Sequence, residues 1–206
     1  MDRKEVLNKI AGGESLADED ISFTDLSDID FKGADLSGAT LTGSRLDRSN
    51  LSGCNLTGAF MAEIFARETN FSGAEMEDAF FQRGDISKAN FSSAKMSDAS
   101  IFWIEGKGVV FDDARMDGAQ ILRSTLPGAS FKNADMANSS LKGSEIQDCK
   151  FTNAVLQNCD MRQVMAQGAM FEGAETEGVK FYGKKPWSGE SDARDWSEEF
   201  VGYDGD

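Results

Sequence analysis

Residues 31–61 read FKGADLSGATLTGSRLDRSNLSGCNLTGAFM, and this stretch decides the fold. Leu, Phe or Met stands at every fifth position, and a small residue stands two places before each of them from Leu36 onward. The same register runs from Leu16 to Phe181 without an insertion. It holds 34 positions, of which 30 are Leu, Ile, Phe or Met, far more than the composition would give by chance. The chain is therefore predicted to be a repeat protein with a five-residue unit.

The local motif is small–polar–apolar–polar–polar, as in residues 34–38 (ADLSG) and 89–93 (ANFSS). Over residues 16–181 it resembles the pentapeptide-repeat family, whose consensus is Ala-(Asp/Asn)-(Leu/Phe)-x-x. The resemblance implies an all-β fold, a right-handed quadrilateral parallel β-helix. In this fold four pentapeptides form one square coil of 20 residues, and the apolar and small residues point inward.

A second regularity tests the 20-residue coil independently. Coils about 4.8 Å apart should stack like side chains, so each side should repeat its own core residue every 20 positions. One side carries Phe at positions 31, 71, 91, 111, 131, 151 and 171, with Leu51 as the exception. The next side carries Leu or Met from Leu36 to Leu156. We expect about eight coils, which form a rod roughly 40 Å long.

Three departures from the register share one side of the predicted solenoid. Ala66, Gly106 and Ala166 replace the large apolar residue, and each follows a bulky residue at the normally small position. The large and the small residue of the repeat have exchanged positions, which keeps the volume of the core unchanged. We therefore interpret the departures as packing variants rather than as an active site. The bulky partners are Ile64, Ile104 and Val164.

The two ends of a solenoid need caps, and the sequence divides accordingly into residues 1–13, 14–181 and 182–206. The first segment predicts a capping helix, with Asp2 as N-cap, Glu5 completing a capping box and an apolar stripe. The last is an acidic, aromatic C-terminal tail with Trp196 and Phe200 as candidate docking residues. Three interpretations of it stay open: a cap, a dimer or partner element, or disorder. The expected stripe is Val6, Leu7 and Ile10.

The composition excludes several function classes. The formal charge is −15 and histidine is absent, which removes the commonest general base, the serine triad and most transition-metal sites. An acidic chain is a poor nucleic-acid binder. No apolar run approaches the ~18 residues of a membrane span, and the first residues do not form a secretory signal. We expect a cytoplasmic, non-enzymatic protein with no cofactor, no metal, no membrane and no direct nucleic-acid partner.

The three cysteines occupy the small inward position of their repeats. A free cysteine behaves as a small buried apolar residue, so we interpret them as substitutes for alanine rather than as a metal or redox site. They are Cys54, Cys149 and Cys159.

Charge is unevenly placed around the predicted solenoid. The side with the Leu and Met ladder holds nine acids against Lys95 and Arg115, a net charge of −7. The following side has a net charge of +3. We call the first side the acidic face; its acids are Asp35, Glu75, Glu77, Asp78, Asp98, Asp117, Asp135, Glu175 and Glu177.

The mildly basic side also carries outward-pointing aromatic residues, and we call it the aromatic face. Its repeats are centred on Leu41, Met61, Phe81 and the residues that follow at intervals of 20. Most other coils place Asp, Asn, Ser or Thr at the equivalent outward positions. A contiguous apolar patch of this kind indicates an interface with a protein partner. The candidate partner-binding residues are Phe60, Phe80, Phe102, Trp103 and Leu122, with Phe65 around the corner.

Three functions follow, from different classes. The first is a protein-interaction scaffold that uses the aromatic patch and the acidic face. The second comes from the resemblance: quinolone-resistance and gyrase-inhibiting pentapeptide proteins are acidic rods that imitate DNA and bind type II topoisomerases such as gyrase. The third is an accessory or effector protein of a secretion system. The sequence leaves the partner's identity and homodimerisation open.

Overall fold

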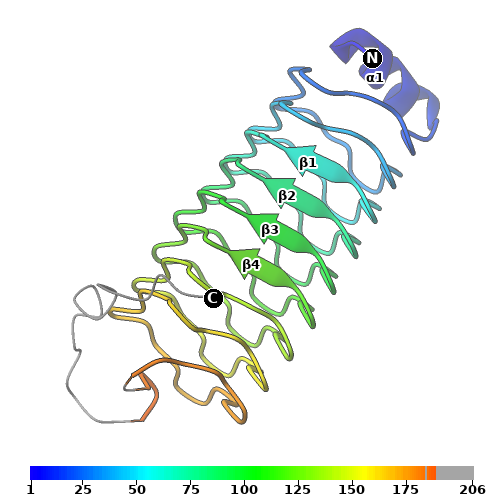
Figure 1. Ribbon diagram of the computed structural model, residues 1–206. Coiled ribbons are helices and arrows are strands. Elements are labelled where there is room, and N and C mark those ends of the chain that lie inside the picture. The colour runs from blue at the N-terminus through cyan, green and yellow to red at the C-terminus, as the bar shows by residue number, and fades with distance from the viewer. Residues whose placement is uncertain (184, 189–206) are drawn as a thin grey trace, which may run out of the picture.

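The chain forms a solenoid of stacked square coils in the computed structural model, which describes residues 1–183 and 185–188 (Figure 1). Each coil has 20 residues, because each outward residue pairs with the residue 20 positions later. Asp35 pairs with Asn55, and Asn55 with Glu75, both in parallel orientation. Backbone hydrogen bonds join the coils; the N–H of Leu36 donates to the carbonyl of Asn55 at 2.7 Å. The predicted right-handed quadrilateral β-helix is confirmed.

Four regular strands lie on one side of the solenoid, the aromatic face (Figure 1). They are β1 (Phe60–Ala62), β2 (Phe80–Gln82), β3 (Ser100–Phe102) and β4 (Gln120–Leu122), and they form a parallel sheet in that order. In each strand the central residue is buried, and its neighbours are half-buried or exposed except Ala62 of β1, which is buried. Elsewhere the described coils are joined by isolated bridges between turns.

The core is a set of ladders of like side chains. The rings of Phe91, Phe111 and Phe131 stack with centroids 5.0 Å apart, and the ladder continues in both directions from Phe71 to Phe171. These spacings match the separation of neighbouring strands, so the coil repeat itself brings the rings into contact. The phenylalanine ladder predicted from the 20-residue spacing is confirmed.

The three exchanged positions are packing features, as expected. Ile104 and Gly106 are both buried within one coil. A Cβ on Gly106 would lie 2.7 Å from Cδ2 of Leu126 and 3.3 Å from Cγ1 of Ile86, so no room is left for a side chain. The Ile64–Ala66 and Val164–Ala166 pairs are also buried.

Helix α1 (Arg3–Gly12) covers the first coil (Figure 1). Asp2 caps it by accepting from the N–H of Glu5, and the Glu5 side chain accepts from the N–H of Asp2, which completes the predicted capping box. Val6 is fully buried against the core, and Ile10 packs there in part. Leu7 is 41% exposed, so its predicted place in the buried stripe is wrong, because only one narrow side of the helix meets the coil.

The opposite end of the core is covered by a residue just beyond the repeats. The Trp187 ring contacts Phe171 and Phe181 edge-on, with centroids 5.2 and 5.4 Å apart. Sequence reasoning assigned Trp187 no role within residues 182–206. Residues Trp196 and Phe200 lie outside the described residues. Within the described part of the chain, no helix is long and apolar enough to cross a bilayer.

Candidate functional site

The aromatic residues of the aromatic face touch one another in a continuous chain. Phe60 and Phe80, which stand opposite each other on β1 and β2, stack with centroids 4.8 Å apart and rings 5° from parallel. Phe80 meets Phe102 edge-on at 5.8 Å, and the Phe102 ring lies 6.2 Å from that of Trp103. The structure thus brings together four of the predicted partner-binding residues across three successive coils.

These rings remain open to solvent. Phe60 is 41% exposed and Trp103 43%, whereas Phe80 and Phe102 are half-buried by their neighbours. The centres of the same strands, Met61 and Phe81, point into the core, so the outer rings do not contribute to it. The cluster is an apolar surface that the rest of the described chain leaves uncovered.

Trp103 occupies a turn position that favours glycine. Its φ angle is 53°, in the left-handed region, where a residue with a large side chain is strained. At the equivalent positions 20 residues away, Arg83 and Arg123 also have positive φ angles, and Gly143 follows after them. The guanidinium of Arg83 lies 5.5 Å from the centre of the Trp103 ring, a cation–π contact that holds the ring on the surface.

Two predicted residues stand apart from the ring cluster. Leu122 pairs with Phe102 across the sheet and is half-buried, so it extends the apolar surface onto β4. Phe65 lies on the adjoining side, where the guanidinium of Arg45 is 5.3 Å from its ring centre. No ring contact joins Phe65 to the cluster among the described residues.

Sequence reasoning missed two exposed aromatic residues of the same face. Phe23 is 79% exposed, and its ring covers Gly43, at which a Cβ would lie 2.5 Å from the ring. Tyr182 is 55% exposed. The signal was available, because each stands a multiple of 20 residues from Trp103 or Phe102 and so falls in the same outward column.

The end of the aromatic face beyond the rings is basic. Arg162 forms a two-pronged ion pair with Asp160, with distances of 2.8 and 2.6 Å. The hydrogen bonds from Arg162 keep the pKa of Asp160 below its ordinary value. Among the described residues, no ion pair neutralises the other three cations on this part of the face. Those cations are Arg123, Lys142 and Lys180.

All nine predicted acids of the acidic face lie at outward positions of one side, none of them buried. They do not form an unbroken column. Glu75, Lys95, Arg115 and Asp135 follow one another in successive coils, and Lys95 donates to Glu75 at 2.5 Å. Two cations thus interrupt the negative charge near the middle of the rod.

The cysteines lie in the core, as predicted from their repeat position. Burial raises the pKa of the Cys54 thiol to about 11 and that of Cys149 to about 12. The Cys149 thiol donates to the carbonyl of Leu126 at 3.1 Å. Within the part of the chain that the structure describes, no three His, Cys, Asp or Glu side chains are grouped as a metal site.

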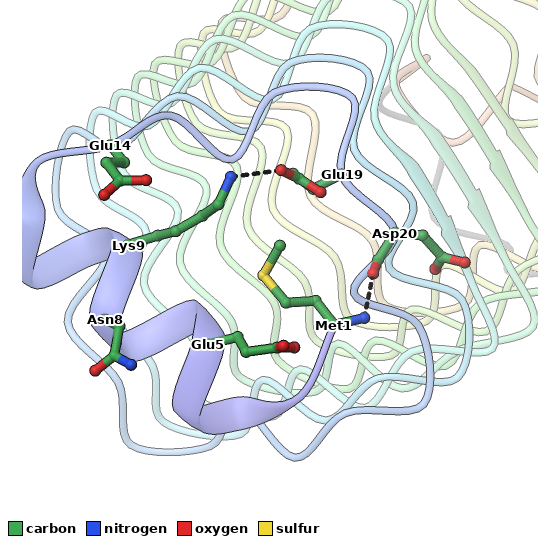
Figure 2. A pocket seen from close by; sticks show the side chains of 7 residues that line it. All are labelled: Met1, Glu5, Asn8, Lys9, Glu14, Glu19 and Asp20. Carbon is green, nitrogen blue, oxygen red and sulfur yellow. Dashed lines mark hydrogen bonds and ion pairs between the residues drawn. The ribbon is translucent and has the colours of Figure 1, made fainter.

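A hollow lies between α1 and the first coil (Figure 2). Lys9 reaches across it to pair with Glu19, and the N-terminal ammonium group donates to the carbonyl of Asp20 at 2.8 Å. These contacts fasten the helix to the coil. We therefore assign the hollow a structural role.

Comparison with known families agrees with the repeat geometry. The model of the family "Pentapeptide repeats" matches overlapping segments that span residues 24–101 and a further segment, 144–181, together more than half of the chain. The chain belongs to the pentapeptide-repeat family. No curated protein matches the chain.

Solved pentapeptide-repeat structures are similar to this chain at low sequence identity. HetL, involved in heterocyst differentiation regulation in the cyanobacterium Nostoc, is 20% identical, with coverage of 87% of this chain and 96% of HetL and a TM-score of 0.42. QnrB1, a plasmid-mediated fluoroquinolone resistance protein, is 17% identical, with coverage of 79% and 89% and a TM-score of 0.41. A protein of the Arabidopsis thaliana thylakoid lumen is 22% identical, with coverage of 48% and 66% and a TM-score of 0.43.

Proposed function

We propose that this pentapeptide-repeat protein is a non-enzymatic interaction module that binds a protein partner through its aromatic face. The observation that carries the proposal is the connected cluster of Phe60, Phe80, Phe102 and Trp103. Large aromatic side chains are the residues that contribute most to protein interfaces, especially when they cluster.

Two further features support this assignment. The fold does not need these rings, because the core is complete beneath them. A basic end beside the rings would favour a partner with acidic and aromatic residues.

The test is affinity capture from the host with the full chain and with the double variant Phe80→Ser/Trp103→Ser. We expect the variant to lose specific capture while its circular dichroism spectrum stays unchanged. Met170→Ser is the control, because Met170 is a similarly exposed apolar residue but lies on the side of the phenylalanine ladder. Equal capture by the double variant and the unaltered chain would contradict the proposal.

The acidic face supports a second candidate function, the binding of a type II topoisomerase in place of DNA. Its nine acids line one side of the rod. The interruption by Lys95 and Arg115 weakens the case, because a DNA duplex presents an unbroken series of negative charges. A gyrase supercoiling assay with and without quinolone separates the two functions. An effect that persists in the Phe80→Ser/Trp103→Ser variant would favour the second.

A further inference from the structure

We propose that residues 189–206 of the same chain bind the basic and aromatic part of the aromatic face, from Lys142 to Trp103. This segment lies outside the described residues, and the inference uses only its sequence and its point of attachment. It rests on the proposed function in one respect, namely that the segment would compete with the protein partner for the same rings.

The composition of the segment complements that face. Residues 189–206 contain seven acidic residues and one arginine, a net charge of −6. They also contain three aromatic residues, Trp196, Phe200 and Tyr203. The face offers cations without ion pairs in the described chain and rings without a cover. Opposite charge steers such surfaces together, and aromatic contact then stabilises the complex.

The order of groups along the face matches the order along the segment. From the end of the solenoid, one outward column runs through Tyr182, Arg162, Lys142, Leu122 and Phe102. Arg123 and Trp103 lie in the adjacent column. A chain that returns along this face would meet the cations first and the rings after them. The acids Glu190, Asp192 and Asp195 likewise precede Trp196 and Phe200.

The segment also has the necessary length. The last repeat that the chain completes, residues 179–183, belongs to the aromatic face, and the chain then crosses the end of the core, where Trp187 contacts Phe171 and Phe181. From that repeat to Trp103 is four coils, or about 19 Å at the spacing of β-strands. The eight residues from Gly189 to Trp196 span up to about 28 Å when extended. Trp196 can therefore reach the ring cluster in the same molecule.

The experiment uses the full chain with Trp196→p-benzoyl-phenylalanine, a photo-crosslinking residue. After irradiation, we expect a product of monomer mass whose crosslinks map to residues 100–104 and 120–124. The charge-reversal variant Arg123→Glu/Lys142→Glu should lower the crosslink yield at least fivefold. The matched control, Arg115→Glu/Lys132→Glu, changes one Arg and one Lys of the same two coils on other sides and should leave the yield unchanged.

Three outcomes would overturn the proposal. The first is a set of crosslinks that map away from the aromatic face. The second is a product of dimer mass, which would assign the segment to a second copy. The third is a crosslink yield that both charge-reversal variants change equally. The crosslink needs no partner. Its failure is therefore distinguishable from failure of the proposed function, which the capture by Phe80→Ser/Trp103→Ser tests by itself.

Discussion

The exchange of large and small residues at Ile104 and Gly106 makes a quantitative prediction about the core. If the two positions share one volume, the double variant Ile104→Ala/Gly106→Leu restores the usual order of the repeat. The double variant should then lose less free energy of unfolding than the two single variants lose together. The interpretation as packing variants depends on this coupling.

The magnitudes follow from burial and contact. Ile104→Ala removes three buried carbons and should lower the free energy of unfolding by about 2–5 kcal/mol. Gly106→Leu introduces a Cβ 2.7 Å from Cδ2 of Leu126, and such overpacking costs about 1–3 kcal/mol. We expect the double variant to be at least ~1 kcal/mol more stable than the sum of the two losses predicts.

The assay is urea unfolding of the four proteins, followed by circular dichroism at one pH. With a slope of about 1–3 kcal/mol per molar urea, a coupling of ~1 kcal/mol moves the midpoint by about 0.3–1 M. Ile104→Ala combined with Leu41→Ala, a core residue on another side and three coils away, provides the additive control. Additive losses in Ile104→Ala/Gly106→Leu, within about 0.5 kcal/mol, would refute the volume exchange.

Two further predictions concern titratable groups. The thiols of Cys54, Cys149 and Cys159 should not react with a thiol reagent at pH 8 in the folded protein and should all react in denaturant, because they are buried with raised pKa values. The pKa of Asp160 is lowered by Arg162, so its contribution to stability is present above its ordinary pKa and is lost as the pH falls below about 4. Asp160→Asn should reduce the fall in the urea midpoint between pH 5 and pH 3; an unchanged fall would argue against this ion pair.

The five-residue register was sufficient to predict the coil and the core ladders, and the spacing of Asp2 and Glu5 predicted the capping box. Each depends on one periodic rule or on contacts within a few residues, as with Asp2 and Glu5. The four-stranded sheet was not predicted, because it depends on residues such as Gln82 and Phe102 being extended where other repeats have a turn. The Trp187 contact was missed for another reason, since it joins the last coil from outside the repeat.

Residues at intervals of 20, which form one column along a side of the solenoid, predicted the candidate site better than single residues did. Phe60 and Phe80 stand 20 residues apart and stack, whereas Phe65 is close to Phe60 in sequence but lies on another side. Exposure by itself would have grouped Phe60 with Phe65 and left out the half-buried Phe80. In a square solenoid, sequence neighbours separate at each corner, and residues 20 apart become neighbours.

The same rule explains why net charge is a poor guide to function in this chain. The value of −15 sums charges that the fold places on different sides of the solenoid. Charged residues lie next to each other only when they stand on the same side in successive coils. Lys95 stands 20 residues after Glu75 and neutralises it, whereas Lys142 and Arg162 stand together beside the rings with only Asp160 to offset them. A chain that is acidic overall therefore presents one basic, aromatic face, and a partner for that face is best sought among acidic and aromatic segments.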